Sequence, residues 1–213
     1  MLFISSGEIY GISSDPDAAF TEKEQGYIDI LNPRSCYPES KRAAETLCAS
    51  YHQQYGVDAL VARLCHVYGP SITADNSRMD AQFLRCVLEQ RDIVMKSPGT
   101  QVRSFCYVKD AVSGLLCLLE KGAAGEAYNV ANRNSIASIR EYAETLAQTG
   151  GVGILRDFPP EEEQKGYSLV TRAVLDASKL ESLGWEPVYD IARGLEETYR
   201  LSKEMQQVER KDI

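Results

Sequence analysis

Residues 37–69, YPESKRAAETLCASYHQQYGVDALVARLCHVYG, decide the fold class of this chain. The first part predicts a helix over 37–55, because apolar side chains recur there with the 3.6-residue period of one helix face. These are Ala44, Leu47, Cys48, Tyr51 and Tyr55. Gly56 is typical of a helix end. The second part, 57–69, is apolar almost throughout, as in a parallel strand that is covered on both faces.

The segments on either side continue the alternation of strand and helix. LFIS at 2–5 predicts a buried strand, and the polar stretch 12–33 predicts a long loop. Downstream, Ser135 or Ser138 is expected to cap one of the helices. The further helices are expected at 80–91, 109–121, 136–149, 176–184 and 190–205, and the further strands within 93–108 and 125–132. Strands that alternate with helices predict an α/β fold with a parallel sheet.

Composition and charge exclude several classes of function. The chain has 213 residues and a net charge of −8, which argues against binding to nucleic acid or to an anionic membrane. No apolar run reaches the ~18 residues of a membrane span, and the first residues do not resemble a signal peptide. The six cysteines form no CxxC pair and there are only two histidines, so we expect no metal site. Reduced cysteines of this kind are typical of a cytoplasmic protein.

A tyrosine and a lysine stand four residues apart where the first helix is expected to begin. Tyr37 and Lys41 therefore share one helix face. An ammonium near a phenol favours the phenolate, which can act as a base at neutral pH. Pro38 disfavours helical geometry at the preceding residue, so Tyr37 is expected at the very start of the helix. That position suits a side chain that faces a cleft better than one packed in the middle of a helix.

Polar residues also follow the two strands that flank this helix. Ser6 and Glu8 come after the strand at 2–5, and His66 lies near the end of the strand at 57–69. Ligands of open parallel sheets bind at the carboxyl ends of the strands. The sequence therefore predicts that these residues meet Tyr37 and Lys41 in one crevice.

Taken together, the motifs resemble one family. The matching segments are FISSGEIYG, NPRSCYPESKRAAE, ARLCHVYGP, GTQVRSFCYVKDAV, YNVAN and LGWEP. In this order they resemble the extended short-chain dehydrogenase/reductases that act on nucleotide sugars, the NAD-dependent epimerases and dehydratases. NPRSCY followed by SKR, and the later RSFCYV, are most similar to UDP-glucuronate decarboxylases.

The resemblance implies a reaction that begins with oxidation of the sugar at C4 by NAD. Tyr37 would take the proton of the C4 hydroxyl, and Ser6 would hydrogen-bond the C4 oxygen. Lys41 would bind the nicotinamide ribose and stabilise the Tyr37 phenolate. His66 stands where the family usually has asparagine, and could contact cofactor or substrate or be a core histidine. The 4-keto intermediate would then allow epimerisation, elimination or loss of a C5 carboxylate.

The resemblance also implies how the substrate is held and which reaction follows. Arg103 would bind the nucleotide diphosphate, because a guanidinium forks well onto phosphate oxygens. Arg172 would face the diphosphate or the sugar. Glu8 is typical of dehydratases and decarboxylases, where it acts at C5 or orients the substrate. Gly7 replaces the aspartate of the 4,6-dehydratases, so decarboxylation and epimerisation remain open.

The glycine-rich GxxGxxG fingerprint of this family does not occur in the sequence. In the family it follows the first strand and cradles the NAD pyrophosphate. We therefore expect the C-terminal part of a Rossmann-like parallel sheet at 1–70. A smaller α/β substrate-binding lobe is expected mainly at 71–213, with 104–131 returning to the Rossmann-like sheet. NAD binding by this chain alone is expected to be weak or absent.

Three functions remain open from the sequence. The first is a fragment of an NAD-dependent nucleotide-sugar decarboxylase or epimerase, for which UDP-sugars are the expected ligands. The second is a non-catalytic remnant that binds nucleotide sugars or a partner chain. The third is a 4-keto-sugar reductase. An uncovered sheet edge also predicts a homo-oligomer, with the helix at 37–55 as one contact surface.

Overall fold

The first sheet is parallel and has three strands. The structure, a computed structural model, describes residues 1–13, 15, 17–73, 75–158 and 170–209. Strands β1 (Leu2–Ser6), β2 (Leu60–Leu64) and β6 (Ala127–Val130) lie in the order β1-β2-β6, so β1 is an edge. Both neighbouring pairs are parallel. This arrangement confirms the predicted α/β class with a parallel sheet.

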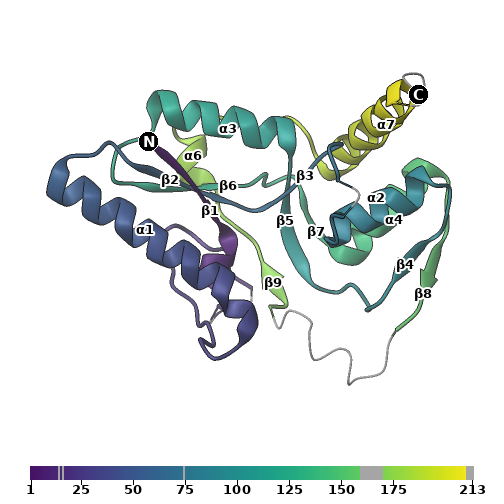
Figure 1. Ribbon diagram of the computed structural model, residues 1–213, viewed down its shortest axis with the longest axis horizontal. Helices are drawn as coiled ribbons and strands as arrows, with labels where there is room; N and C mark the ends of the chain where they lie inside the picture. Colours follow the sequence, from purple (N-terminus) through teal and green to yellow (C-terminus); the bar gives the residue numbers. More distant parts are fainter. Residues whose placement is uncertain (14, 16, 74, 159–169, 210–213) are drawn as a thin grey trace.

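Helices cover both faces of this sheet (Figure 1). Helix α1 (Cys36–Tyr55) packs Cys48 against Val61, while α3 (Val108–Lys121) packs Leu118 against Leu60 on the other face. Val61 and Leu60 are neighbours in β2, so their side chains point to opposite faces. The near-continuous apolar run of this strand is thereby explained, because each face of β2 has a helix to pack against.

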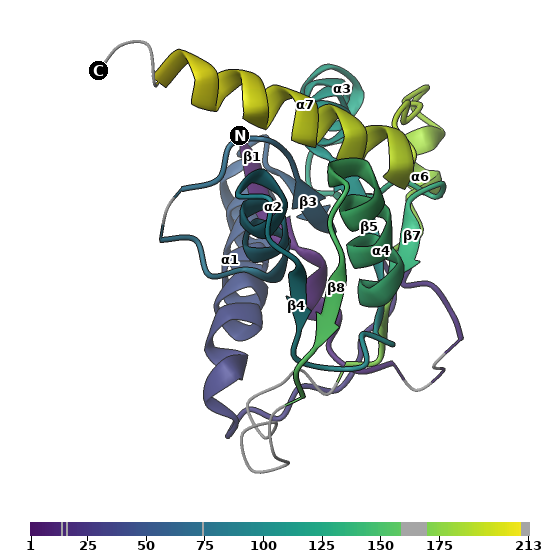
Figure 2. The ribbon, with the colours of Figure 1, turned by 90° about the vertical axis from the view of Figure 1, so that its right-hand side faces the viewer.

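The second sheet is built around β5 (Val102–Tyr107). Strand β3 (His66–Tyr68) pairs with β5 in parallel, as does β9 (Arg172–Ala173), and β7 (Ile136–Ser138) pairs antiparallel. A separate parallel pair consists of β4 (Ile93–Met95) and β8 (Ile154–Arg156). Figure 2 shows this pair beside helices α2 (Met79–Leu88) and α4 (Ile139–Gly150).

Three of the helices that follow β3 pack around one apolar cluster. They are α2 (Met79–Leu88), α4 (Ile139–Gly150) and α7 (Ile191–Glu209). The fully buried rings of Phe105, Tyr107 and Tyr142 lie at the centre of this cluster. The short elements are the 3-10 helices η1 (Gly7–Tyr10) and η2 (Pro33–Ser35) and helix α6 (Ser178–Glu181). None of the helices in the described ranges combines the length and the apolar character that a membrane crossing demands.

Three expected elements differ from the sequence prediction. The strand expected at 57–69 is divided at Cys65, because its two parts pair with different sheets. The two strands expected within 93–108 do form, but β4 pairs with β8 rather than with β5. The helix expected from 136 begins at Ile139, because residues 136–138 pair with β5 instead.

The cap of α4 shows which of two serines was the better candidate. The Ser138 hydroxyl accepts a hydrogen bond from the backbone N–H of Glu141, and the Glu141 carboxylate accepts one from the backbone N–H of Ser138. This is a complete capping box. Ser135 is buried and donates instead to the backbone oxygen of Tyr189, 3.2 Å away.

The strands within 104–131 belong to two different sheets. Within 104–131, β6 does join the sheet of β1 and β2, as expected of a segment that returns to it. The residues of β5 in the same range pair with β3, β7 and β9. Residues 104–107 thus pair within the second sheet, and the expected domain division stays a prediction.

A buried ion pair joins α1 to the first sheet. Arg63 of β2 and Glu45 of α1 lie 2.6 Å apart, with side chains only 13% and 12% exposed. Ser5 of β1 also hydrogen-bonds Glu45, and the Arg63 guanidinium donates to the hydroxyl of Tyr10 at 2.9 Å. Burial raises the pKa of Tyr10 to about 12 despite the nearby Arg63, so its hydroxyl stays neutral and donates to Asn129 at 2.7 Å. One network thus fixes β1, β2, β6 and α1 relative to one another.

We expect Arg63→Met to lower the free energy of unfolding by about 3–5 kcal/mol, because the Glu45 carboxylate would stay buried without its charge partner. Urea denaturation measures the change. Arg91→Met is the matched control, since Arg91 and Glu89 form the same type of pair on the surface and its loss should leave stability nearly unchanged. Equal losses in the two variants would contradict the role given to the buried pair.

Candidate active site

Tyr37 and Lys41 lie together at the start of α1. The Lys41 ammonium is 5.7 Å from the centre of the Tyr37 ring and 5.1 Å from that of Phe3 in β1. Tyr37 is the second residue of the helix and is 45% exposed. The structure therefore brings the predicted pair together and leaves the tyrosine open to a ligand.

The Lys41 ammonium also contacts the edge of the first sheet, donating to the backbone oxygen of Ile4 at 2.8 Å. Leu60 of β2 donates to the oxygen of Met1, and successive carbonyls of a strand point in opposite directions. The Ile4 carbonyl therefore points away from β2, towards the open edge. Lys41 hydrogen-bonds an atom that another strand would otherwise use.

Ser6 ends β1 and caps the 3-10 helix that follows. Its hydroxyl accepts a hydrogen bond from the backbone N–H of Glu8 at 3.2 Å. Arg42, next to Lys41 in α1, donates to the backbone oxygens of Ile9 and Gly26 at 2.8 and 3.0 Å. Ser6 and Glu8 are thus held at a fixed position relative to the helix that carries Tyr37 and Lys41.

Glu8 connects this group to a second one on the β5 sheet. Side chains alternate along a strand, so Arg103 and Phe105 of β5 share one face. His66 is opposite Phe105, and their rings meet edge to face at 5.1 Å. Ala173 is opposite Arg103, and the side chain of Leu175 two residues on packs against Gly7. We call the side of the β5 sheet that carries Arg103, with Glu8 and His66 beside it, the Arg103 face; the Phe105 ring on the same side is fully buried.

The Arg103 guanidinium is partly desolvated. It donates to the backbone oxygens of Val102 and Val170 at 2.9 and 2.7 Å. Burial lowers the pKa of this guanidinium, and the carboxylate of Glu8 offsets part of that effect. Arginine remains charged at neutral pH even so. A desolvated cation that faces backbone oxygens and one nearby carboxylate is suited to an anionic ligand.

The side chain of Arg172 starts on the opposite face of the sheet from that of Arg103. It is opposite Val102, the neighbour of Arg103, so the two arginines start on opposite faces. Its Nε is buried and has no hydrogen-bond partner in the described part of the chain. The structure does not join Arg172 to the Arg103 face, and its contact with a diphosphate stays a prediction.

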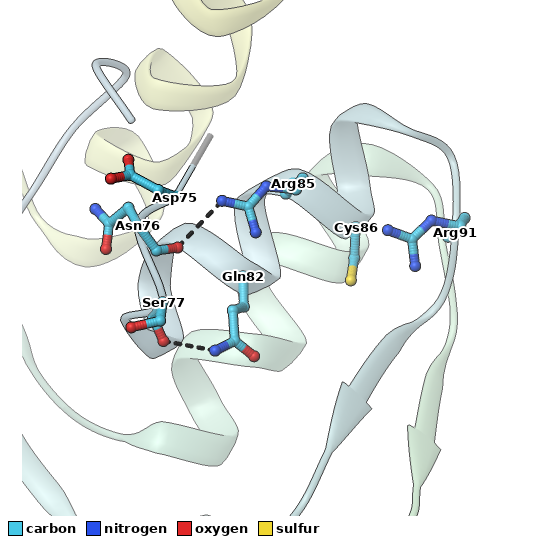
Figure 3. A pocket seen from close by; sticks show the side chains of 7 residues that line it. All are labelled: Asp75, Asn76, Ser77, Gln82, Arg85, Cys86 and Arg91. Atoms are coloured by element: carbon cyan, nitrogen blue, oxygen red, sulfur yellow. Dashed lines mark hydrogen bonds between the residues drawn. The ribbon is translucent and has the colours of Figure 1, made fainter. Parts of the chain in front are cut away.

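One cavity lies away from all of these residues. It has a volume of about 320 Å³ and lies on the outer side of α2 (Figure 3). Of the described residues it is lined by Asp75, Asn76, Ser77, Gln82, Arg85, Cys86 and Arg91. Figure 3 shows Arg85 and Gln82 turned towards backbone oxygens of the loop that precedes the helix. These contacts serve the loop, so we do not take the cavity as the reaction site.

Sequence reasoning missed two residues next to the predicted site. Asp80 of α2 lies 3.3 Å from the Nε2 atom of His66, a contact across 14 positions that no local pattern indicates. Arg63 pairs with Glu45, and Glu45 accepts a hydrogen bond from Ser5 of β1, the strand that ends at Ser6. Arg63 did carry a signal, because a charged residue within an apolar strand needs a buried partner.

The residues present fit one end of an NAD molecule. An ammonium has three N–H donors, and the Ile4 oxygen takes one from Lys41. The other donors and the exposed Tyr37 hydroxyl fit the hydroxyl groups of a ribose. The sequence offers no GxxGxxG turn for the pyrophosphate, so the fit is limited to the nicotinamide-ribose end.

Comparison with known proteins finds relatives among the UDP-glucuronic acid decarboxylases. UDP-glucuronic acid decarboxylase 5 from Arabidopsis thaliana is 34% identical over an alignment of 210 positions, which covers 94% of this chain and 58% of the plant protein. UDP-glucuronic acid decarboxylase 1 from Xenopus tropicalis is 31% identical over 93% of this chain and 45% of its own. The chain thus spans about half the length of these curated relatives.

Solved structures of related enzymes have the same fold. The UDP-glucuronic acid 4-epimerase from Bacillus cereus, solved with UDP-glucuronic acid and NAD, matches with a TM-score of 0.78 and 26% identity, over 96% of this chain and 61% of that one. The dTDP-glucose 4,6-dehydratase from Bacillus anthracis, solved with NAD, matches with a TM-score of 0.81 and 24% identity, over 97% and 62%. The α/β architecture is therefore the Rossmann-like one expected from the sequence.

The family model of the NAD-dependent epimerases and dehydratases matches residues 1–131. That range includes β1, α1 and the Arg103 face. The chain belongs to the NAD-dependent epimerase/dehydratase family.

Proposed function

We propose that this chain is the substrate-side part of an NAD-dependent nucleotide-sugar decarboxylase or epimerase that works through a 4-keto sugar. The placement of Lys41 carries the proposal. Its ammonium lies beside the Tyr37 ring and on the backbone of Ile4, two residues before Ser6. This placement supports a base, Tyr37, that works with Lys41 and the Ser6 hydroxyl at the end of β1.

The chain's own residues would handle the proton at C4 of the sugar. Bound NAD supplies the hydride acceptor for C4. Tyr37 removes the proton of the C4 hydroxyl, and the Ser6 hydroxyl holds the C4 oxygen. Lys41 stabilises the tyrosine anion and orients the ribose. A carbonyl at C4 makes the bonds at C5 labile, and Glu8, whose carboxylate is exposed, would act there as a base or orient the substrate.

Gly7 favours decarboxylation or epimerisation over dehydration. A dehydratase needs an acid that protonates the leaving hydroxyl, and glycine has no side chain to do so. A Cβ atom at Gly7 would also lie 2.9 Å from the side chain of Leu175, so a larger residue would have to displace that leucine. The decarboxylases and the 4-epimerase named above act on glucuronic acid attached to UDP, which supports UDP-glucuronate as the first substrate to test.

A second reading is a non-catalytic remnant that binds nucleotide sugars or a partner chain. The open edge of β1 and the missing pyrophosphate turn support it, because both suggest that the chain alone is inactive. The retained Tyr37, Lys41 and Ser6 favour the catalytic reading. The six free cysteines fit a reducing compartment such as the cytoplasm.

Nucleotide-sugar binding can be tested by thermal melting of the chain with UDP, UDP-glucose, UDP-glucuronate or NAD. We expect the UDP compounds to raise the melting temperature, because a hundredfold excess over Kd adds ~2.7 kcal/mol to the free energy of unfolding. NAD should have little effect on the melting temperature. Arg103→Gln should remove the shift, because the diphosphate loses its cation. Arg133→Gln, which changes an exposed arginine paired with Glu181, should keep it. A shift with NAD and none with UDP compounds would contradict the proposal.

Catalysis can be tested on the chain joined to the NAD-binding segment of the Arabidopsis relative. We expect release of CO2 from UDP-glucuronate for a decarboxylase, a C4 or C5 epimer for an epimerase, and consumption of NADH by a 4-keto sugar for a reductase. Tyr37→Phe should lower kcat by about 10²–10⁴-fold. Tyr51→Phe, on the exposed side of the same helix, should not. Equal activity of both variants would rule out Tyr37 as the base.

We also propose a homodimer through α1. Leu47, Tyr51 and Tyr55 are exposed and recur every four residues, so they form an apolar stripe on the outer side of this helix. Leu47→Glu should convert the dimer to a monomer in sedimentation equilibrium. Leu155→Glu changes an equally exposed leucine on β8 and should leave the dimer intact. A wild-type monomer at micromolar concentration would contradict the proposal.

A further inference from the structure

One guanidinium connects α1 to two segments that precede this helix in the chain. The Nε atom of Arg42 donates to the backbone oxygen of Ile9 at 2.8 Å, and its Nη2 atom donates to that of Gly26 at 3.0 Å. Ile9 belongs to η1, and Gly26 belongs to the long loop that leads back to α1. The Nη1 atom lies 3.2 Å from the Glu39 carboxylate, one turn earlier in the helix. All three nitrogen atoms of the guanidinium therefore have a partner.

The backbones of η1 and the loop come close enough for one side chain to reach both. A Cβ atom at Gly26 would lie 2.1 Å from the oxygen of Tyr10 and 2.5 Å from that of Ile12, so a larger residue does not fit there. Ile12 and Tyr27 exchange two backbone hydrogen bonds, at 2.9 and 3.0 Å. Arg42 joins this pair of segments to α1. Within the described ranges, no other side chain of α1 hydrogen-bonds η1.

The short helix η1 places Glu8 between the two groups of the candidate site. Glu8 is exposed. Burial lowers the pKa of Arg103 and the carboxylate of Glu8 raises it, so the two charges interact. The next residue, Ile9, is buried and gives its oxygen to Arg42. Arg42 thereby ties the position of Glu8 to the helix that carries the proposed base.

A second anchor holds η1 to the first sheet. The Tyr10 hydroxyl donates to Asn129 of β6 at 2.7 Å, and the Tyr10 ring stacks on that of Phe20 at 4.7 Å. Loss of the Arg42 contacts would leave this anchor in place, so we expect the fold to persist. A 3-10 turn of four residues has few hydrogen bonds of its own. Its position relative to α1 therefore depends on the contact with Arg42.

We propose that Arg42 is the residue that positions Glu8 for the step at C5 of the sugar. The proposal rests on the proposed function, because it names a further residue for the same reaction. Once C4 is a ketone, C5 either loses a proton and regains one, or loses its carboxylate as CO2 and takes up a proton in its place. In both cases the electron pair left at C5 is held as the enolate of the ketone until the proton arrives.

The two steps of the reaction should differ in their dependence on Arg42. Tyr37 of α1 handles the proton at C4, and this helix keeps its place through Glu45 and Arg63. Glu8 acts at C5 only when η1 stands at the right distance from the sugar. A misplacement of about 1 Å can lower a rate about 10²-fold. Arg42 is thus a positioning residue for the second step and not for the first.

Hydrogen exchange on the chain itself measures the positioning. The reporting groups are the backbone N–H groups of Gly11, Ile12 and Tyr27. Arg42→Gln should speed their exchange about tenfold or more, because the turn and the loop lose two hydrogen bonds from a charged donor. Arg140→Gln is the matched control, since the Arg140 guanidinium donates twice to the oxygen of Pro98, at 3.0 and 2.8 Å, and should leave the three rates unchanged. Unchanged rates in Arg42→Gln would overturn the proposal.

Turnover of UDP-glucuronate by the joined protein described above separates the step at C5 from oxidation at C4. Arg42→Gln should slow product formation about 10²-fold, whereas NADH and the 4-keto sugar still form and accumulate. The Kd of UDP-glucuronate should not change, because Arg103 holds the diphosphate in the proposed function. Arg140→Gln should behave like the unmodified chain. Equal slowing of oxidation and product formation in Arg42→Gln would indicate a purely structural role and overturn the proposal.

Two further variants separate the backbone contacts of Arg42 from its ion pair. Arg42→Lys keeps a charged donor that can reach one of the two oxygens, so it should restore part of the rate at C5. Glu39→Gln removes the exposed ion pair and leaves both backbone contacts, so it should behave like the unmodified chain. A loss in Glu39→Gln as large as that in Arg42→Gln would overturn positioning through the backbone.

Failure of the proposed function would look different. If the joined protein with the unmodified chain oxidised no UDP-sugar, the nucleotide-sugar function would fail, and the exchange rates alone would decide whether Arg42 positions η1. A joined protein that inverts C4 and leaves C5 untouched would overturn the role of Arg42 in a step at C5.

Discussion

The arrangement of the site depends on the buried pair of Arg63 and Glu45. Glu45 lies one helical turn after Lys41 in α1, and Arg63 is in the middle of β2. Their contact sets how far α1 stands from the sheet, and the hydrogen bond from Ser5 brings β1 into the same network. A buried pair contributes little net stability compared with apolar packing, but it admits one geometry. The distance between the Tyr37 helix and Ser6 is fixed by that geometry.

Charge is distributed unevenly in this acidic molecule. The chain as a whole carries −8, whereas the charges near the Arg103 face balance. Arg103 interacts with the carboxylate of Glu8, and Arg78 lies 3.5 Å from that of Asp80. This face is therefore less negative than the molecule as a whole, which favours an anionic ligand there.

The sequence predicts the parts of this structure that depend on local periodicity. The α/β class, the helix from 36 to 55 and the closeness of Tyr37 and Lys41 all follow from spacing within a few residues. The division of the strand at Cys65 does not, because it results from pairing with two sheets formed by distant segments. The contact of Asp80 with His66 and the side on which Arg172 lies likewise depend on tertiary packing and strand register.

The contact of Lys41 with Ile4 links the site to the open edge of the sheet. A parallel strand that joined β1 would hydrogen-bond the outward carbonyls of that strand, and the Ile4 oxygen is one of them. The ammonium would then compete with a backbone N–H for the same acceptor. A strand that joined β1 would therefore release Lys41, and the two equilibria would be coupled. In a molecule whose β1 edge is free, the Lys41 ammonium would stay hydrogen-bonded to the Ile4 oxygen for part of the time.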